Sequence, residues 1–150
     1  MTGVKHKQAK SLATPNVEKT PRLSENPDAY LALNPSWRIG KVDLVDPFGW
    51  HCLDQDSIHR IRQKLSEFES MTWSEVLIKA RKQNHPVPVS HFNKPARSRL
   101  AALALDDQEE LLSLRLAGKE RIWGILVRGV LTLLWWDPHH RVCPCDLKHT

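Results

Sequence analysis

The sequence predicts an α+β domain in which two to three helices pack on one face of a small antiparallel β-meander sheet. Three apolar runs follow one another between residues 111 and 144, separated by short polar breaks at 117–120 and 128–129. Such runs are typical of consecutive strands joined by tight turns. Ahead of them, apolar residues recur at helical spacing behind residues that cap helices. Helices followed by a run of strands indicate this fold class.

Length and composition indicate one globular domain with an N-terminal tail. The chain has 150 residues, of which 41% are hydrophobic and 26% charged, and these values suit a single domain with a real core. Residues 1–35 are rich in Lys, Pro, Ser and Asn and contain few large apolar side chains. We expect this segment to be a disordered or loosely attached basic tail, and residues 36–150 to form the domain.

Several broad classes of protein are disfavoured. The apolar run 122–136 is split by Arg128 and Gly129, so neither piece reaches the roughly 20 residues that a membrane helix needs. The N-terminus lacks the apolar core of a secretory signal, and the cysteines are odd in number, so we expect a reduced, cytoplasmic protein. A Gly-rich phosphate loop and a G-x-S-x-G motif are both missing from the sequence, and we expect no cofactor.

The segment before the meander predicts an extended piece and two helices. Residues 37–45 read as extended, with interruptions at Asp46-Pro47 and Gly49. A first amphipathic helix is indicated by periodic apolar residues behind three capping candidates. The periodic residues are Ile58, Ile61, Leu65 and Phe68, and the capping candidates are Asp54, Asp56 and Ser57. The run Thr72-Trp73-Ser74-Glu75 has the form of a capping box, so a second helix should begin there and end before Pro86.

A third helix and the strands complete the predicted domain. After an extended piece from Pro86 to Phe92, Pro95 lies near the start of a helical pattern marked by Ala96, Leu100 and Leu103, which Asp106-Asp107 closes. In the first strand of the meander, leucines at 112, 114 and 116 alternate with Ser113 and Arg115. This alternation predicts one buried and one polar face. The next two strands should be covered on both sides, with Arg128-Gly129 as a two-residue hairpin loop.

Basic residues dominate the middle of a chain whose formal charge is +5. Residues 76–105 contain no Asp or Glu. Lys and Arg that neutralise phosphates supply most sequence-independent affinity for nucleic acid, so an RNA-binding surface is one interpretation. Its predicted members are Lys79, Arg81, Lys82, Lys94, Arg97, Arg99, Lys119 and Arg141. The other interpretation is a solvated basic surface neutralised by counterions, because residues of one sign in sequence need not form one patch in space.

Two arginines flank the turn between the first two strands of the meander. Arg115 and Arg121 should lie on adjacent strands within reach of each other. Paired guanidinium groups can bind a phosphate or stabilise a charged pentacoordinate transition state. Alternatively, both arginines pair with acidic residues at the sheet surface, for which the candidates are Glu109, Glu110 and Glu120.

A histidine pair follows the third strand directly. His139 and His140 lie between Asp137-Pro138 and Arg141, and imidazole suits proton transfer near neutral pH. RNA cleavage needs one group to take the proton from the 2′-hydroxyl, another to protonate the leaving oxygen, and cations for the phosphate. Alternatively, the pair caps a surface turn. Because neighbouring side chains usually point apart, we expect only one histidine to be central.

The two cysteines Cys143 and Cys145 do not indicate a metal site, and the tryptophans mainly indicate packing. Cys143 and Cys145 are separated only by Pro144, whereas paired cysteines in structural zinc sites usually enclose two to four residues. We therefore expect no metal. Of the six tryptophans, Trp135 and Trp136 should occupy opposite faces of their strand. One ring should fill the core, and the other either packs as well or stacks on a base.

The order of elements and the residues of the meander resemble the RelE/ParE-type superfamily of bacterial toxins, which includes HigB-like messenger-RNA endonucleases. That family has two packed helices followed by a meander. Its motifs are similar to Leu111-Leu112-Ser113-Leu114-Arg115, to Glu120-Arg121-Ile122 and to Leu134-Trp135-Trp136-Asp137-Pro138-His139-His140-Arg141-Val142. The resemblance covers about residues 55–144. A tyrosine common near the family's C-terminus is replaced here by Cys143, and the stretch between the helices and the meander is longer than is typical.

The resemblance implies a toxin-like endoribonuclease that cleaves messenger RNA, commonly on the ribosome, without a metal, and that a cognate antitoxin protein restrains. Arg115 and Arg121 would match the arginines that handle phosphate, and His139 or His140 the late acid–base position. Two other readings remain. One is a non-catalytic basic module that binds nucleic acid or a protein, such as a gyrase-poisoning relative or an accessory subunit. The other is a protein without chemistry of its own, whose tail 1–35 recruits a partner.

Overall fold

The computed structural model describes residues 26 and 28–144, and most of the predicted tail lies outside these residues. Before the sheet, the chain forms a 3-10 turn, η1 (Ala29–Ala32), whose Tyr30 and Leu31 pack against the core. The backbone N–H of Trp73 donates to the carbonyl of Leu33 at 2.9 Å. The ordered domain therefore begins before residue 36, within the segment that we assigned to the tail.

Five strands form one mixed sheet in the order β1-β5-β4-β3-β2. The central meander consists of β3 (Glu110–Ala117), β4 (Glu120–Val127) and β5 (Val130–Asp137), which pair antiparallel. Short strands β2 (His85–Pro88) and β1 (Ser36–Arg38) flank it, and β1 runs parallel to β5. These elements confirm the α+β class.

The predicted two-residue hairpin between β4 and β5 is confirmed. Arg128 and Gly129 have φ angles of 52° and 86°. Positive φ at both central residues is the requirement of the turn whose twist matches paired strands.

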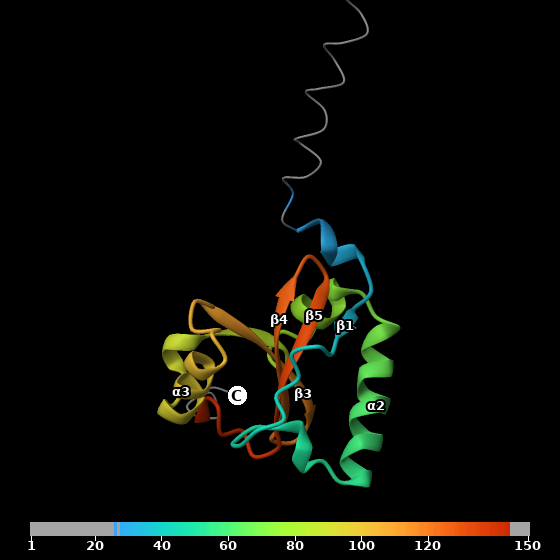
Figure 1. Cartoon of the computed structure of the whole chain (residues 1–150). Helices are drawn as coiled ribbons and strands as arrows, with labels where there is room; N and C mark the ends of the chain where they lie inside the picture. Colours follow the sequence, from blue (N-terminus) through green and yellow to red (C-terminus); the bar gives the residue numbers. More distant parts are fainter. Residues whose placement is uncertain (1–25, 27, 145–150) are drawn as a thin grey trace, which may run out of the picture.

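Helices cover both faces of the sheet, and the expectation that they occupy one face is wrong (Figure 1). Helix α2 (Gln55–Glu69) buries Ile61 and Phe68 against the leucines of β3 that alternate from Leu112. Helix α3 (Lys94–Ala102) packs Leu100 against the opposite face, beside Leu111. The supposedly polar face of β3 is itself buried, because even Ser113 is only 3% exposed.

The first two helices begin at the predicted capping residues, but the second is shorter than predicted. Asp54 caps α2 by accepting from the N–H of Ser57 at 2.8 Å. The capping box before the second helix is confirmed, since the N–H of Glu75 donates to Thr72 Oγ1 and the N–H of Thr72 to Glu75 Oε1. However, the helix that follows is a single π-turn, η3 (Glu75–Lys79), so it ends well before Pro86.

Two further predictions need correction. Ile58, expected on the buried stripe of the first helix, is 51% exposed. The segment expected to be extended from residue 37 to 45 forms a strand only at β1, and the following residues fold into a loop that leads to the short helix η2 (Trp50–Cys52).

The third predicted helix corresponds to α3, and Asn93 caps it by accepting from the N–H of Ala96 at 3.0 Å. A short turn, η4 (Val89–His91), precedes it.

A bulge in β5 attaches that loop to the sheet. Trp123 pairs with Trp135, whereas Gly124 pairs with Leu133, so Leu134 is the extra residue of a β-bulge. The carbonyl of Leu134 accepts from the N–H of Asp43 at 2.9 Å and from the indole of Trp50 at 3.2 Å. In a regular ladder the carbonyl of Leu134 would accept from the neighbouring strand, whereas at the bulge it accepts from the loop.

The tryptophans are structural residues. Trp135 and Trp136 belong to opposite core layers, as predicted, and both are buried. All six indole N–H groups donate hydrogen bonds, which satisfies a polar group that is costly to bury alone. The acceptors are Glu69 for Trp37, the carbonyl of Leu134 for Trp50, the carbonyl of Gly129 for Trp73, Asp137 for Trp123, Asp43 for Trp135, and Glu120 for Trp136.

Among the described residues, none of the helices has both the length and the apolar character that crossing a bilayer requires.

Candidate active site

Three of the residues singled out in the sequence form a row across the sheet. Arg115 of β3 is the register partner of Arg121 of β4, and Arg121 is the partner of Asp137 of β5. Residues directly opposite in neighbouring strands project from the same face. Since Trp123 of the layer under α3 donates to Asp137, the row belongs to the α3 face at the end of the sheet that carries the β3–β4 turn.

Both arginines of the row are directed at one carbonyl of that turn. Arg115 donates through Nε to the carbonyl of Gly118 at 3.1 Å, and Arg121 donates through Nη1 to the same oxygen at 2.7 Å. Arg121 is only 6% exposed, whereas Arg115 is half-buried. Two guanidinium groups gathered at one point form the kind of pair that can bind a phosphate.

The acidic residues considered as alternative partners are placed elsewhere. Glu120 lies on the other face, where its carboxylate accepts from Trp136 at 2.8 Å and pairs with Arg60 at 3.3 Å. This interaction raises the pKa of Arg60, chiefly through the hydrogen bond to Glu120. Glu109 and Glu110 lie at the start of β3, at the opposite end of the strand from Arg115. The carboxylates proposed as surface partners are thus remote from the paired guanidinium groups or bound to other groups.

Asp137 organises the segment that carries the histidines. Asp137 is 1% exposed, and its carboxylate oxygens accept from the indole of Trp123 and from the backbone N–H groups of Arg141 at 2.8 Å and Val142 at 3.0 Å. A carboxylate that accepts several N–H bonds fixes the turn around it. Asp137 therefore positions the loop 138–142 relative to the arginine row.

The two histidines have different environments. His140 is 3% exposed and has a φ of 57°. His139 is exposed and lines a pocket of about 300 Å³ together with Arg141 and Cys52. Residues 47–49 also line this pocket, whereas Arg115 and Arg121 do not. His139 is thus the histidine that a ligand in this pocket can reach.

Arg99, predicted to bind RNA, is held by a buried carboxylate. Its Nε and Nη2 donate to the two oxygens of Asp43 at 2.9 and 2.8 Å, and the Asp43 side chain is 2% exposed. Burial opposes ionisation of Asp43, but the hydrogen bonds from Arg99 and Trp135 and the charge of Arg99 leave its pKa below the ordinary value. The guanidinium of Arg99 therefore stabilises the fold.

The other predicted RNA-binding residues are divided between the two layers. Lys94 and Arg97 are exposed on α3, and Lys119 and Arg141 are exposed at the end of the sheet near the arginine row. Lys79, Arg81 and Lys82 belong to η3 and the turn after it, in the layer of α2. The basic run of the sequence is consequently split by the sheet.

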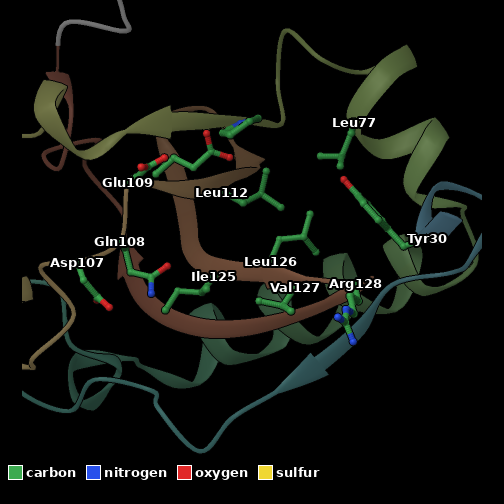
Figure 2. A pocket seen from close by; sticks show the side chains of 12 residues that line it. Tyr30, Leu77, Asp107, Gln108, Glu109, Leu112, Ile125, Leu126, Val127 and Arg128 are labelled. Carbon is green, nitrogen blue, oxygen red and sulfur yellow. The ribbon is translucent and has the colours of Figure 1, made fainter. Parts of the chain in front are cut away.

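A larger pocket lies at the other end of the sheet. It has a volume of about 660 Å³ and is lined by residues from η1, η3 and the ends of β3 and β4, including Tyr30, Leu77 and Arg128 (Figure 2). Asp107, Glu109 and Glu110 also line it. Carboxylates in this number repel a phosphodiester, so this pocket does not suit the predicted substrate.

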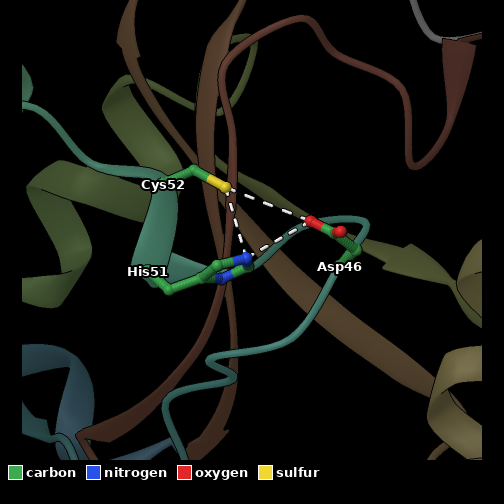
Figure 3. Close-up of side chains that lie close together, drawn as sticks. All are labelled: Asp46, His51 and Cys52. Atoms are coloured by element: carbon green, nitrogen blue, oxygen red, sulfur yellow. Dashed lines mark hydrogen bonds and ion pairs between the residues drawn. The ribbon is translucent and has the colours of Figure 1, made fainter.

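One cluster of polar side chains was missed in the sequence. Asp46, His51 and Cys52 converge at the edge of the His139 pocket, which Cys52 lines (Figure 3). The signal available was the His51-Cys52 pair five residues after Asp46, with a Pro-Phe-Gly turn between them. In contrast, Cys143 is buried and its Sγ donates to the carbonyl of His91. Cys145 lies outside the described residues.

A comparison with known proteins finds no family model, no curated protein and no solved structure that matches this chain.

Proposed function

We propose that the protein is a toxin-like endoribonuclease that cleaves messenger RNA, with its active site at the end of the sheet where the arginine row meets the loop of His139. The observation that carries this proposal is the register Arg115–Arg121–Asp137, which joins two cations to the histidine loop through adjacent strands. A phosphate-binding pair and an accessible imidazole are two of the kinds of group that RNA cleavage requires.

Each residue has a distinct part in the proposed reaction. Arg115, the more exposed of the pair, contacts the scissile phosphate, while the buried Arg121 holds positive charge beneath it. His139, the histidine that lines the pocket, takes the proton of the attacking 2′-hydroxyl as the P–O5′ bond breaks, and water protonates the leaving 5′-oxygen. Arg141 and Lys119, both exposed, bind neighbouring phosphates. Buried His140 supports the loop.

The proposal extends to partners and location by resemblance to the RelE/ParE-type toxins. It implies messenger RNA as the substrate, the ribosome as the usual place of cleavage, and a cognate antitoxin protein that restrains the enzyme in the cytoplasm. The arginine row and the histidine loop would then be the surface that the antitoxin must cover or distort.

The test is to map messenger-RNA ends by primer extension in cells induced to express the intact chain. New ends are expected with the parent sequence and should disappear with His139→Ala. General acid–base groups contribute about 10²–10⁴-fold to the rate, so loss of one histidine is sufficient to remove the signal. His59→Ala is the matched control, since His59 is an exposed histidine on α2, in the other layer.

The proposal fails if His139→Ala, shown to be folded by circular dichroism, produces the same ends as the parent chain. It also fails if the parent chain produces no new ends at all. Purified protein incubated with an RNA oligonucleotide in the presence of a chelator adds a second readout, because the proposed cleavage needs no metal.

A non-catalytic basic module is the second candidate. The exposed residues Lys94 and Arg97 on α3, on the same face as the arginine row, favour it. In that case Lys94→Ala with Arg97→Ala should weaken RNA binding and reduce its salt dependence, whereas His139→Ala should leave binding unchanged. A filter-binding titration at two salt concentrations separates the two candidates.

A further inference from the structure

We propose that Asp46, His51 and Cys52 form a binding site for a zinc-class transition metal ion at the edge of the His139 pocket. The three side chains come from one loop and the short helix η2, and their donor atoms point toward one another (Figure 3). This inference does not depend on the proposed ribonuclease activity.

The distances among the donor atoms match a tetrahedral site. Nε2 of His51 lies 3.3 Å from Oδ1 of Asp46 and 3.3 Å from Sγ of Cys52, and Sγ lies 4.0 Å from Oδ1. Zinc bonds of about 2.0 Å to nitrogen and oxygen and about 2.3 Å to sulfur, at tetrahedral angles, separate these atoms by about 3.3–3.5 Å. Closing the longest edge by about 0.5 Å therefore completes the geometry.

The arrangement differs from that of a cysteine nucleophile with a histidine base. In a catalytic relay the carboxylate and the nucleophile bind opposite nitrogens of the imidazole. Here both the sulfur and the carboxylate oxygen approach the same nitrogen, Nε2. Three lone-pair donors directed at a common point are suited to a cation.

The surrounding fold holds His51 in place. A Cβ atom at Gly49 would lie 2.2 Å from Nδ1 of His51 and 2.8 Å from the backbone nitrogen of Val45. Glycine is therefore required for the imidazole to lie against the chain at this point.

The loop itself is anchored to β5 on both sides of Asp46. Phe48 is 3% exposed, its ring packs 5.1 Å from that of Trp135, and its carbonyl accepts from the N–H of Trp136. The N–H of Trp50 donates to the carbonyl of Asp43 at 2.8 Å, and its indole donates to Leu134. Because the backbone is anchored on both sides of Asp46 and directly before His51, little ordering is left for the ion to impose.

The donor set selects the chemical class of the ion. One thiolate, one imidazole and one carboxylate suit zinc and its close neighbours, whereas magnesium and calcium prefer oxygen ligands alone. Three protein ligands leave a fourth position open for water. His51 and Asp46 are exposed, with side-chain exposures of 37% and 83%, so an ion can enter without local unfolding.

The experiment is a titration of the intact, metal-stripped, reduced protein with Co²⁺, which has the coordination preferences of zinc and absorbs visible light. We expect one Co²⁺ per chain, with the strong visible bands of four-coordinate cobalt and a near-ultraviolet band from thiolate to metal. Zn²⁺ should remove both signals by displacement. The parent chain and His139→Ala should behave alike if the site is independent of the ribonuclease.

Single substitutions test whether Asp46, His51 and Cys52, and not other side chains, bind the ion. Cys52→Ser should abolish the thiolate band, and Asp46→Asn and His51→Ala should each lower the affinity at least tenfold. Gly49→Ala keeps all three ligands but displaces the imidazole, so it should weaken binding about 10- to 100-fold, the range typical of changes that reorient a metal ligand. The matched controls are Cys145→Ser and His59→Ala, which should bind as the parent does.

The proposal is overturned if the parent chain gives no thiolate-to-cobalt band, or if Cys52→Ser keeps that band. It is equally overturned if Cys145→Ser removes the band while Cys52→Ser does not. Circular dichroism of each variant confirms that lost binding does not reflect unfolding. Failure here leaves the messenger-RNA mapping unaffected, since that assay reports on His139 and needs no metal.

Discussion

Replacing Arg99 with alanine is expected to destabilise the fold, although its sequence context suggests a residue for RNA. The change removes both hydrogen bonds to Asp43, whose side chain is 2% exposed. Breaking a buried ion pair from one side leaves a charge without compensation, at a cost of about 3–5 kcal/mol.

The lower end of that range applies here. The Arg99 side chain is 20% exposed, and after its removal Asp43 still accepts from the indole of Trp135 and from the N–H of Val45. We therefore expect the free energy of unfolding to fall by about 3 kcal/mol. For a domain of this size that corresponds to a decrease in melting temperature of roughly 10 °C.

Urea unfolding followed by tryptophan fluorescence measures the change, with Arg97→Ala as the control, because Arg97 is exposed on the same helix. Adding Asp43→Asn to Arg99→Ala should cost less than the sum of the two single changes, since the pair acts as a unit. The reasoning is refuted if Arg99→Ala unfolds at the same urea concentration as Arg97→Ala.

Two further outcomes follow from the same structure. Because the pKa of Asp43 is lowered in the folded state, the unfolded chain binds the proton first as pH falls. The stability due to Asp43 should thus be complete above its ordinary pKa of about 3.9 and decline as pH falls through the folded value. Urea unfolding across an acidic pH series should show a smaller decline for Asp43→Asn, and equal declines would contradict the assignment. Gly129→Ala should lower the free energy of unfolding by about 1–2 kcal/mol, because Gly129 has a φ of 86° and a Cβ there would lie 3.1 Å from Tyr30. Gly40→Ala, where a Cβ meets nothing within 4 Å, should change the thermal melting temperature very little, and similar losses at both positions would argue against backbone strain.

Local patterns predicted the parts of the fold that depend on neighbours in sequence. The Arg128-Gly129 turn, the Thr72–Glu75 capping box and the three strands of the meander each rest on a few consecutive residues. A reader of the sequence can see these signals directly. The α+β class follows from them.

The same local patterns could not predict pairings between residues that are far apart in the sequence. The strand β1 pairs with β5, so that Ser36 faces Val130, and no short-range signal indicates this contact. Ser113 suggested a solvent-exposed face, but α3 and its neighbouring loops cover that face. The role of Arg99 is set by Asp43, which lies 56 residues earlier.

The candidate site shows the same division. The pairing of Arg115 with Arg121 was predictable, because both flank one short turn. The sequence predicted that His139 and His140 would differ, but it did not predict which of the two is buried. The convergence of Asp46 on His51 and Cys52 depends on a loop anchored by the bulge at Leu134, and the sequence carries no sign of that bulge.

The position of β5 also determines when this chain can fold during its synthesis. This strand is the last of the five to leave the ribosome, yet it lies between β1 and β4 and contributes side chains to both hydrophobic layers. Neither layer can close around a nascent chain that ends before Val130. The many apolar side chains made earlier must therefore wait, exposed to chaperones and proteases, until β5 has left the ribosome.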